Sequence, residues 1–365
     1  MSFAKTTKPS QIVPLTGIRG LAAWWVVLFH IAYLLPSLPA SLYWFARLGF
    51  LGVDLFFVLS GFIISYNYWD RFSPFSIKIY RRFLWARLAR LYPVHLFTLV
   101  VSAILLLGVR ISGVSTLKNF STWTPGTFVA NVFLVHAWRI HAVESWNNAS
   151  WSVSCEWFAY ILFPLLVFCR LQKLPSKFGG FIAVLLPAIP AIFVQMLNIP
   201  SFFLLIKVIC EFTAGCLMFH LYRSRREHSH SSRIIGLKVG LVLNLMTVLI
   251  HHFRYVAPDW LALLFPFVIL ALAESTGILA RIVDSRIAVY WGKVSYSLYM
   301  THNVTLWILK ARAPAPQSGA SILLFSIYII SIAIVAICTY HFVEEPCRAW
   351  MRTWNRPTPV RAVSA

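Results

Sequence analysis

The stretch IRGLAAWWVVLFH, residues 18–30, decides the fold class of this chain. It is apolar except for Arg19 near one end and His30 at the other, and its apolar character continues to Leu35. A helix that crosses a bilayer needs about 20 mostly apolar residues, because each backbone polar group must find its partner within the helix. No small-x-small cleavage pattern follows. The stretch therefore predicts a retained membrane-spanning helix near residues 17–35 rather than a signal peptide.

The composition of the whole chain favours the same environment. Of 365 residues, 59% are hydrophobic and 12% are charged, whereas about a quarter of the residues in soluble domains are charged. The mean hydropathy is +0.74. The net charge is +21, but the basic residues fall between apolar runs, as membrane topology requires. The expected partner is therefore the lipid bilayer rather than nucleic acid.

Apolar runs of sufficient length recur along the chain and predict an all-α fold, a polytopic integral-membrane helix bundle. We expect ten spans, near residues 17–35, 49–67, 93–109, 152–170, 179–197, 202–221, 234–251, 256–273, 286–307 and 320–342. No internal repeat is evident, so the inverted-repeat signature of many transporters is missing. We assign residues 1–346 to the membrane domain. Residues 347–365 form a basic tail without chemistry, either interfacial or disordered.

The basic residues also predict an orientation. With the N-terminus in the cytoplasm, roughly two thirds of the 32 lysines and arginines fall on the cytoplasmic side. The predicted topology is therefore N-in and C-in, with an even number of spans.

Arg19 and His30 are the first polar residues that an apolar helix does not explain. Eleven residues make about three helical turns, so both side chains point the same way, about 16 Å apart. A snorkelling arginine and a satisfied interior histidine are one interpretation. The other gives His30 the role of general base or nucleophile and gives Arg19 a phosphate to bind.

Two further stretches carry polar groups at the predicted membrane boundary or within it. In the second span, Asp54 lies near the outer end, and Ser60-Gly61 lies mid-span, where a small residue permits close approach of a helix or of a ligand. Arg87 and Arg90 are helix neighbours on the cytoplasmic side. Positive-inside anchoring explains them, as does a grip on an anionic cofactor such as a nucleotide diphosphate.

The fourth span begins with SWSVSCE, in which Glu156 lies one turn beyond Ser152. A structural ion pair is one role for Glu156, and orienting a catalytic imidazole or an acceptor hydroxyl is the other. The long outer connection before it, residues 110–151, holds a half-apolar piece too short to span. Its tryptophans, with Trp151, suit interfacial anchoring or stacking on sugar rings.

Cysteine and histidine usage indicates no further chemistry. The six cysteines form no CxxC pair and mostly lie in apolar runs, as small buried hydrophobes do. His220, His228 and His230 lack convergent carboxylates, so we expect no metal site.

Six blocks, in order, resemble the motifs of the membrane acyltransferase-3 family, bacterial O-acyltransferases of surface sugars. They are Arg19-x10-His30, GVDLFFVLSGF (52–62), RLARLYP (87–93), SWSVSCE (150–156), SYSLYMTH (295–302) and VEEP (343–346). The family often has Glu-Glu where this chain has Cys155-Glu156. The resemblance covers residues 14–350.

The resemblance implies an enzyme of a bacterial inner membrane that moves an acyl group, usually acetyl, from cytoplasmic acyl-CoA to a sugar hydroxyl. The expected acceptor is an exopolysaccharide, a lipopolysaccharide or a related glycan intermediate. Acyl-CoA is a substrate, and no permanently bound cofactor is expected. The expected roles are catalysis by His30 and Glu156, cofactor binding by Arg19, Arg87, Arg90, Ser60 and Gly61, and substrate binding by Asp54, Trp151 and Ser152.

Two alternatives stay open. A transporter of a glycan or acyl precursor would also keep polar residues in its spans, although the missing repeat and the one-sided arginines oppose it. For an enzyme, His30 acts either as a general base in direct transfer or through an acyl-imidazole.

Overall fold

A computed structural model describes residues 12–34, 39–112, 122–138, 145–197, 202–227, 258–274, 278–312 and 321–354. All regular structure within these ranges is helical, which confirms the predicted all-α class. The α-helices are α1 (Val13–Leu34), α2 (Ala40–Arg47), α3 (Leu51–Tyr68), α4 (Ile77–Ser112), α5 (Pro125–Val132), α6 (Ser150–Phe168), α7 (Ser176–Leu185), α8 (Ala188–Leu197), α9 (Phe202–Glu227), α11 (Phe265–Glu274), α12 (Ile278–Val283), α13 (Arg286–Arg312), α14 (Ser321–Thr339) and α15 (Glu345–Thr353).

Six helical segments within the described ranges are long and apolar enough to cross a membrane. They are Val13–Leu34, Ala40–Phe72, Ile77–Ile111, Ser150–Phe168, Phe203–Arg226 and Ile322–Thr353. Five contain spans predicted from the sequence almost whole, and Ile322–Thr353 contains most of the sixth. The chain is therefore a helical protein with several membrane-spanning candidates, while the expected total of ten stays a prediction.

The remaining four predicted spans differ in kind. The run at 179–197 is divided between α7 and α8, and the run at 256–273 becomes a 3₁₀ segment, Pro258–Leu264, followed by α11. The run at 234–251 lies outside the described residues. Helix α13 has 27 residues, but its buried serines, threonines and histidine lower its hydropathy.

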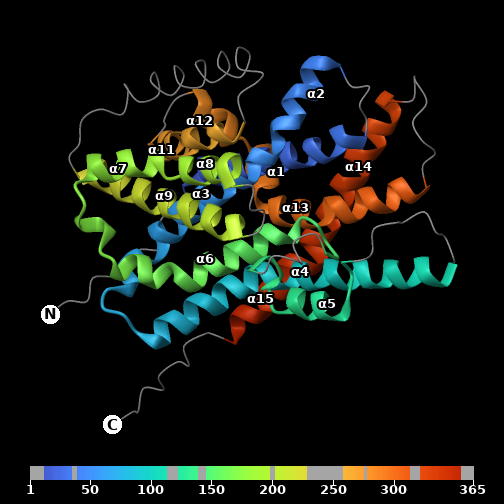
Figure 1. Cartoon of the computed structure of the whole chain (residues 1–365), viewed down its shortest axis with the longest axis horizontal. Helices are drawn as coiled ribbons and strands as arrows, with labels where there is room; N and C mark the ends of the chain where they lie inside the picture. Colours follow the sequence, from blue (N-terminus) through green and yellow to red (C-terminus); the bar gives the residue numbers. More distant parts are fainter. Residues whose placement is uncertain are drawn as a thin grey trace, which may run out of the picture.

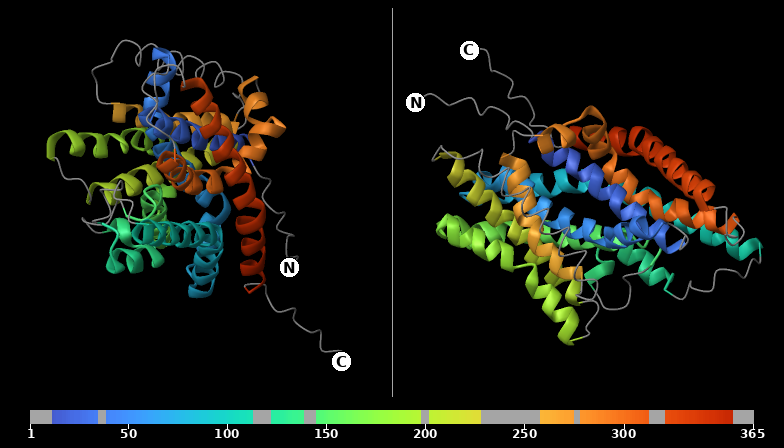
Figure 2. Two further views of the ribbon diagram at one scale, coloured as in Figure 1. Left: turned by 90° about the vertical axis from the view of Figure 1, so that its right-hand side faces the viewer. Right: turned by 90° about the horizontal axis from the view of Figure 1, so that it is seen from above.

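The helices pack in pairs around α1 and α3 (Figures 1 and 2). Helix α1 lies along α13, α3 lies along α9, and α14 covers the other side of α13. Helix α4 contacts α6 and α13. This arrangement brings the first, second, third and fourth predicted spans to one place in the interior, together with α13.

Glycines allow the closest of these contacts. A Cβ on Gly292 of α13 would lie 1.9 Å from the backbone oxygen of Thr16 in α1, and a Cβ on Gly20 would lie 2.8 Å from the nitrogen of Gly292. No other residue fits such a backbone approach, which is how small residues bring membrane helices together. The contact sets the spacing of α1 and α13 at the Arg19 end of α1.

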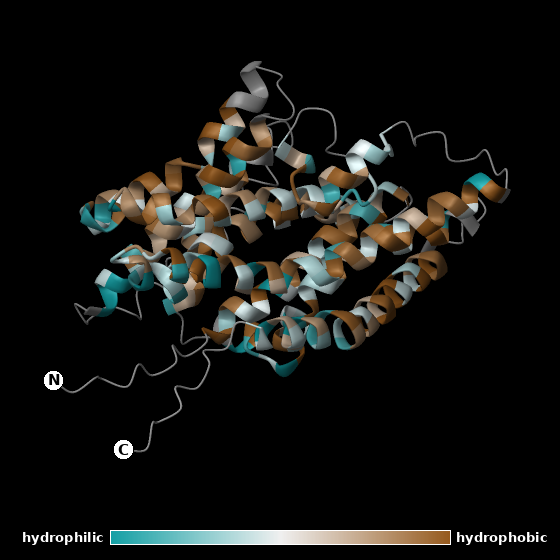
Figure 3. Cartoon of the chain, turned by 90° about the horizontal axis from the view of Figure 1, so that it is seen from below, coloured by the Kyte–Doolittle hydropathy of each residue, from teal (hydrophilic) through white to brown (hydrophobic). Residues whose placement is uncertain are grey.

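The outer surfaces of the long helices are apolar (Figure 3). Large aliphatic side chains are exposed near the C-terminal end of α4 and along α14, among them Ile104, Leu107, Ile111, Ile322, Ile330 and Ile334. Exposed apolar surface on this scale is expected where lipid, not water, is the solvent.

Candidate functional site

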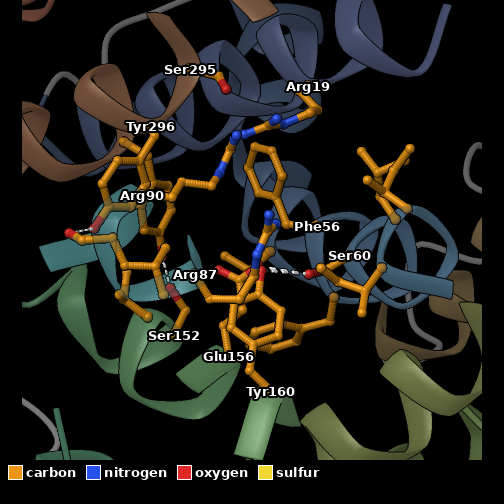
Figure 4. Close-up of a pocket in the computed structure, with 18 residues that line it drawn as sticks. Arg19, Phe56, Ser60, Arg87, Arg90, Ser152, Glu156, Tyr160, Ser295 and Tyr296 are labelled. Carbon is orange, nitrogen blue, oxygen red and sulfur yellow. Dashed lines mark hydrogen bonds between the residues drawn. The ribbon is translucent and has the colours of Figure 1, made fainter. Parts of the chain in front are cut away.

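A cavity of about 110 Å³ lies among α1, α3, α4, α6 and α13 (Figure 4). Six residues assigned to the site from the sequence line it: Arg19, Ser60, Arg87, Arg90, Ser152 and Glu156. They come from four helices that are distant in the sequence. The geometry therefore brings together most, but not all, of the predicted site.

Three arginines make the cavity strongly basic. Arg19 of α1 and Arg87 and Arg90 of α4 extend into the same space (Figure 4). Arg87 donates to the Tyr68 hydroxyl at 3.3 Å, and its buried Nε has no hydrogen-bond partner. Within the described residues no carboxylate lies within 4.0 Å of the three guanidinium groups. The three arginines are half-buried, and a phosphate matches the forked geometry of their guanidinium groups.

Glu156 is the carboxylate of the cavity. It accepts a hydrogen bond from Ser60 Oγ at 2.7 Å and another from the Tyr160 hydroxyl, and the two hydroxyl groups are 3.0 Å apart. Glu156 and Tyr160 are one helical turn apart on α6, while Ser60 reaches them from α3. The small side chain at Ser60 therefore orients the carboxylate, in addition to leaving space in the cavity.

His30 does not line the cavity but meets a second histidine. Its Nδ1 lies 3.0 Å from the Val26 carbonyl oxygen and 3.2 Å from Nε2 of His302 on α13. His302 is fully buried, and its Nδ1 lies 2.5 Å from the Tyr299 carbonyl oxygen. The pair is carried by the two helices that the glycine contact holds together.

These contacts define the tautomers of a neutral pair. A carbonyl oxygen only accepts, so His302 Nδ1 and His30 Nδ1 both carry protons. His302 Nε2 is then the acceptor that faces His30, and His30 Nε2 holds the free lone pair. Within the described residues this nitrogen makes no hydrogen bond, and it is not among the atoms closed off from solvent. His30 is thus prepared to accept a proton or to attack a carbonyl carbon.

Tyr299 connects the cavity to the histidine pair. Its side chain lines the cavity and its hydroxyl lies 2.7 Å from Ser152 Oγ, while its backbone oxygen holds His302. The ring is 5.8 Å from the His302 ring and 6.0 Å from Phe56, which also lines the cavity. Tyr299 and Phe56 therefore form an aromatic wall between the arginines and the histidines.

A family comparison covers all of these residues. A family model described as an acyltransferase domain matches residues 13–341. The chain belongs to this acyltransferase-3 family. The match includes the cavity, His30 and His302, and it ends before α15.

Two of three relatives of this family member are named for acyl transfer. Acyltransferase MdmB of Streptomyces mycarofaciens is 30% identical over 173 residues, which are 46% of this chain and 42% of that protein. A Staphylococcus aureus (strain COL) protein, provisionally named as an O-acetyltransferase, is 22% identical over 376 residues, 95% of this chain and 59% of that protein. Protein 2 in picA locus of Rhizobium radiobacter is 36% identical over 108 residues, 30% of this chain and 52% of that protein.

The acyltransferase-family chain spans about half the length of these relatives. No solved structure matches it.

Three predicted site residues of this acyltransferase-family chain lie outside the cavity lining. Gly61 packs on α9, where a Cβ would lie 1.9 Å from the Phe212 backbone oxygen. Asp54 is buried in an ion pair with Lys207 of α9, at 2.6 Å, and Lys207 also lies 3.2 Å from Glu211. Trp151 packs edge-on against Phe57. These contacts hold the helices, and the proposed ligand roles of these residues stay predictions.

The tryptophans of the outer connection pack on protein. Trp123 stacks on Trp146 at 5.2 Å and lies 5.1 Å from Trp307 of α13. Trp138 donates to the Ser154 carbonyl oxygen at 3.0 Å. The half-apolar piece forms α5, which at eight residues is too short to span. Interfacial anchoring and sugar stacking both remain predictions.

No cysteine or histidine is among the residues that line the cavity. No group of three or more histidines, cysteines, aspartates or glutamates converges in the described part of the chain. All six cysteines are free thiols. His228 and His230 lie outside the described residues, and His220 packs edge-on against Trp69.

The sequence analysis gives no cavity role to four polar lining residues: Tyr160, Ser295, Tyr296 and Tyr299. For Tyr160 a signal is available, because it follows Glu156 by four residues on one helix face. His302 ends the SYSLYMTH block, but its contact with His30 depends on the packing of α1 on α13.

Proposed function

We propose that this protein transfers an acyl group, acetyl above all, from acyl-CoA to a hydroxyl of a sugar in an exopolysaccharide, a lipopolysaccharide or a related glycan intermediate. The observation that carries the proposal is a basic cavity lined by Tyr299, whose ring lies 5.8 Å from the ring of His302 in the His30–His302 pair. Family membership and the names of the relatives support the reaction class.

The cavity favours a narrow chain rather than a whole nucleotide. A volume of about 110 Å³ holds a few water molecules or an extended arm. We propose that the pantetheine arm lies there with its thioester directed toward Tyr299, and that Arg19, Arg87 and Arg90 attract its phosphates to the opening. Ser60 and Glu156 then line the path of the arm.

The chemical step needs a base beside the thioester. In direct transfer, the acceptor oxygen attacks the carbonyl carbon, His30 Nε2 takes the hydroxyl proton, and the carbon–sulfur bond breaks to release the coenzyme thiolate, which receives the proton. In the covalent variant, His30 Nε2 attacks the carbonyl carbon, the carbon–sulfur bond breaks, and the coenzyme leaves as its thiolate. The acceptor oxygen then attacks the acyl-imidazolium, the carbon–nitrogen bond breaks to restore His30, and the hydroxyl proton passes to the thiolate. In either case His302 orients the ring from the other side.

The topology is part of the proposal. With the N- and C-termini in the cytoplasm of a bacterium and about ten spans in the inner membrane, the arginines of α4 face the compartment that holds acyl-CoA. His30 lies about 16 Å beyond Arg19 along the axis of α1. This places it toward the outer half of the membrane, where a lipid-linked glycan is accessible.

The test is acyl transfer by purified protein. Wild type, His30→Ala and Arg87→Ala are each given radiolabelled acetyl-CoA and a glycan-lipid fraction, with Arg286→Ala, at an exposed position outside the cavity, as the control. We expect label in the glycan-lipid with wild type and Arg286→Ala, and a loss of at least about 100-fold with the other two. Undiminished labelling by a folded His30→Ala protein would refute the proposed catalytic role.

The two chemical variants separate when the acceptor is left out. The covalent route accumulates labelled protein that hydroxylamine releases, and His30→Ala does not become labelled. Direct transfer gives no labelled protein and shows ternary-complex kinetics.

A further inference from the structure

Helix α15, which lies beyond the family match, packs on the Ile77 end of α4 (Figure 1). It follows a π-helical turn, Tyr340–Glu344. Trp85 of α4 donates to the Met351 carbonyl oxygen at 2.7 Å, and its ring stacks on Trp354 at 6.0 Å and 14°. These two contacts fix which face of α15 meets α4.

That face adds two arginines to those of the cavity. Arg348 and Arg352 are one turn apart on α15. They lie close enough to Arg87 and Arg90 for the four positively charged guanidinium groups to repel one another. We call these four residues the arginine cluster. Arg348 Nε is buried and, like Arg87 Nε, has no hydrogen-bond partner.

The cluster has little negative charge of its own. Glu344 is the neighbouring carboxylate, and it is buried and accepts a hydrogen bond from Ser297 at 2.7 Å. Within the described part of the chain, no acidic side chain lies within 4.0 Å of any cluster guanidinium. Glu156 lines the cavity with Arg87 and Arg90, so two carboxylates lie among four cations. The excess positive charge is stabilised by a multiply charged anion, which the guanidinium groups can bind through charge-assisted hydrogen bonds.

The position of the cluster indicates which anion. Arg87 and Arg90 belong both to the cluster and to the cavity lining, so a chain that lies in the cavity leaves it at the cluster. With the proposed arm in the cavity, the phosphates of the donor lie at its opening, beside these two arginines. Beyond Trp85 the surface stays basic, in a groove that Lys78, Arg81 and Arg82 line.

We propose that Arg348 and Arg352 of α15, with Arg87 and Arg90, bind the diphosphate of the donor nucleotide at the opening of the cavity. The inference rests on the proposed use of acyl-CoA. The sequence assigned most of α15 to a tail without chemistry. The proposal gives this helix a direct part in donor binding. Because phospholipid headgroups carry the same phosphate chemistry, the test has to separate the two sources.

The experiment measures binding to the full chain in nanodiscs of neutral phosphatidylcholine. Wild type, Arg348→Gln, Arg352→Gln, the double variant and the control Arg286→Gln are titrated with coenzyme A, with inorganic pyrophosphate and with pantetheine, which lacks the nucleotide. We expect each single variant to weaken coenzyme A and pyrophosphate roughly 10- to 100-fold and the double variant more, with pantetheine binding unchanged. The control should match wild type.

Folding is checked through the unfolding temperature and through Arg348→Lys, which keeps the charge and should retain part of the affinity. Coenzyme A affinity that is equal in the double variant and in Arg286→Gln would overturn the proposal. Loss of affinity for phosphatidylglycerol vesicles without loss of coenzyme A binding would assign the cluster to lipid and also overturn it.

The same titrations distinguish a failure of the proposed function from a failure of the α15 proposal. Wild type that binds no coenzyme A at all would contradict the use of acyl-CoA and, with it, the donor assignment of the cluster. The pyrophosphate titration would still decide whether α15 and α4 hold phosphate.

Discussion

At the residue scale, the central arrangement is one histidine oriented by another. His302 accepts from His30 Nδ1 while its own Nδ1 proton goes to the Tyr299 carbonyl oxygen. This leaves His30 Nε2 as the free base, and no acidic side chain in the described part of the chain lies within 4.0 Å of the His30 ring nitrogens. In the proposed reaction His302 is a positioning residue, since it acts through His30.

Replacing His302 therefore tests the orientation of His30. We expect His302→Ala to lower kcat for acyl transfer by roughly 10- to 1,000-fold, less than His30→Ala, because the His30 ring keeps its Val26 contact but loses the second contact that orients it. The KM for acyl-CoA should change little, because the arginines are untouched. Steady-state kinetics with both variants measure this. A His302→Ala enzyme with wild-type kcat, or with only KM changed, would contradict the role.

The structure places six residues that the sequence assigned to the site around one cavity: Arg19, Ser60, Arg87, Arg90, Ser152 and Glu156. Their roles stay predictions. Asp54 could not be placed in this way, because its partner Lys207 lies on α9 and pairing of charges between helices leaves no trace in local sequence. Gly61 was ambiguous from the start, and its contact with the Phe212 backbone is a packing contact.

At the scale of elements, the contact between α1 and α13 positions the histidine pair. In Gly292→Ala the new Cβ would meet the Thr16 backbone oxygen at 1.9 Å, so the two helices must separate. We expect a loss of about 1–3 kcal/mol in the free energy of unfolding, together with a fall in kcat as His30 moves from His302.

The matched control is Gly108→Ala on α4, where a Cβ meets nothing within 4 Å. Alanine there should be neutral or stabilise by about 0.5–1 kcal/mol. Thermal unfolding in detergent and the acyl-transfer assay compare the two variants. Equal behaviour of Gly292→Ala and Gly108→Ala would mean that the close contact does not set the site.

The 3₁₀ segment His136–Trp138 should make the fold sensitive to acid. Burial, and next the nearby His95, lower the pKa of His136 to about 3, although a hydrogen bond with Ser150 opposes the shift. Between about pH 3 and 6.5 the unfolded chain binds a proton at His136 that the folded chain does not, so stability rises with pH through this window and is lost as pH falls.

We expect the unfolding temperature of wild type to fall between pH 7.0 and pH 4.5, and His136→Gln to reduce that fall. His95 stays in both proteins, so its direct contribution is common to them. Differential scanning fluorimetry at matched detergent and salt measures the difference. Parallel pH profiles for the two proteins would show that His136 is not the group responsible.

The element that the sequence placed least well is α15. Residues 347–365 read as a basic tail, whereas the structure places Glu345–Thr353 in a helix against α4. Basic residues with tryptophans are typical of interfacial segments in general, so composition alone cannot distinguish a lipid anchor from a helix that packs on protein. Trp85 and Met351 are far apart in the sequence, so no local sequence pattern indicates their contact.

At the scale of the whole molecule, the helical membrane fold followed from hydropathy alone, because the bilayer constrains spanning segments so strongly. The number of spans did not follow in the same way. Apolar runs such as 179–197 predict a span by composition, yet the structure breaks this one after Leu185, and α13 hides polar residues against α1. Tertiary packing decides such cases.

Topology is the prediction that belongs to this scale. Two single-cysteine variants test it, one with Gly126→Cys in the outer connection and one that retains only Cys169, which is exposed after α6. We expect Gly126→Cys to react with a membrane-impermeant maleimide in intact cells, and Cys169 to react only after the cells are permeabilised. Reaction of Cys169 in intact cells, with protection of Gly126→Cys, would invert the proposed orientation.

The most direct test of the account is a cryo-electron microscopy map of the full chain in nanodiscs with a non-hydrolysable acyl-CoA analogue. We predict density for an extended arm in the cavity between Arg90 and Glu156, with the acyl end at Tyr299 and the His30 pair, and the phosphates at the arginine cluster. Analogue density elsewhere on the protein, with the cavity filled by lipid or water at saturating ligand, would contradict the account.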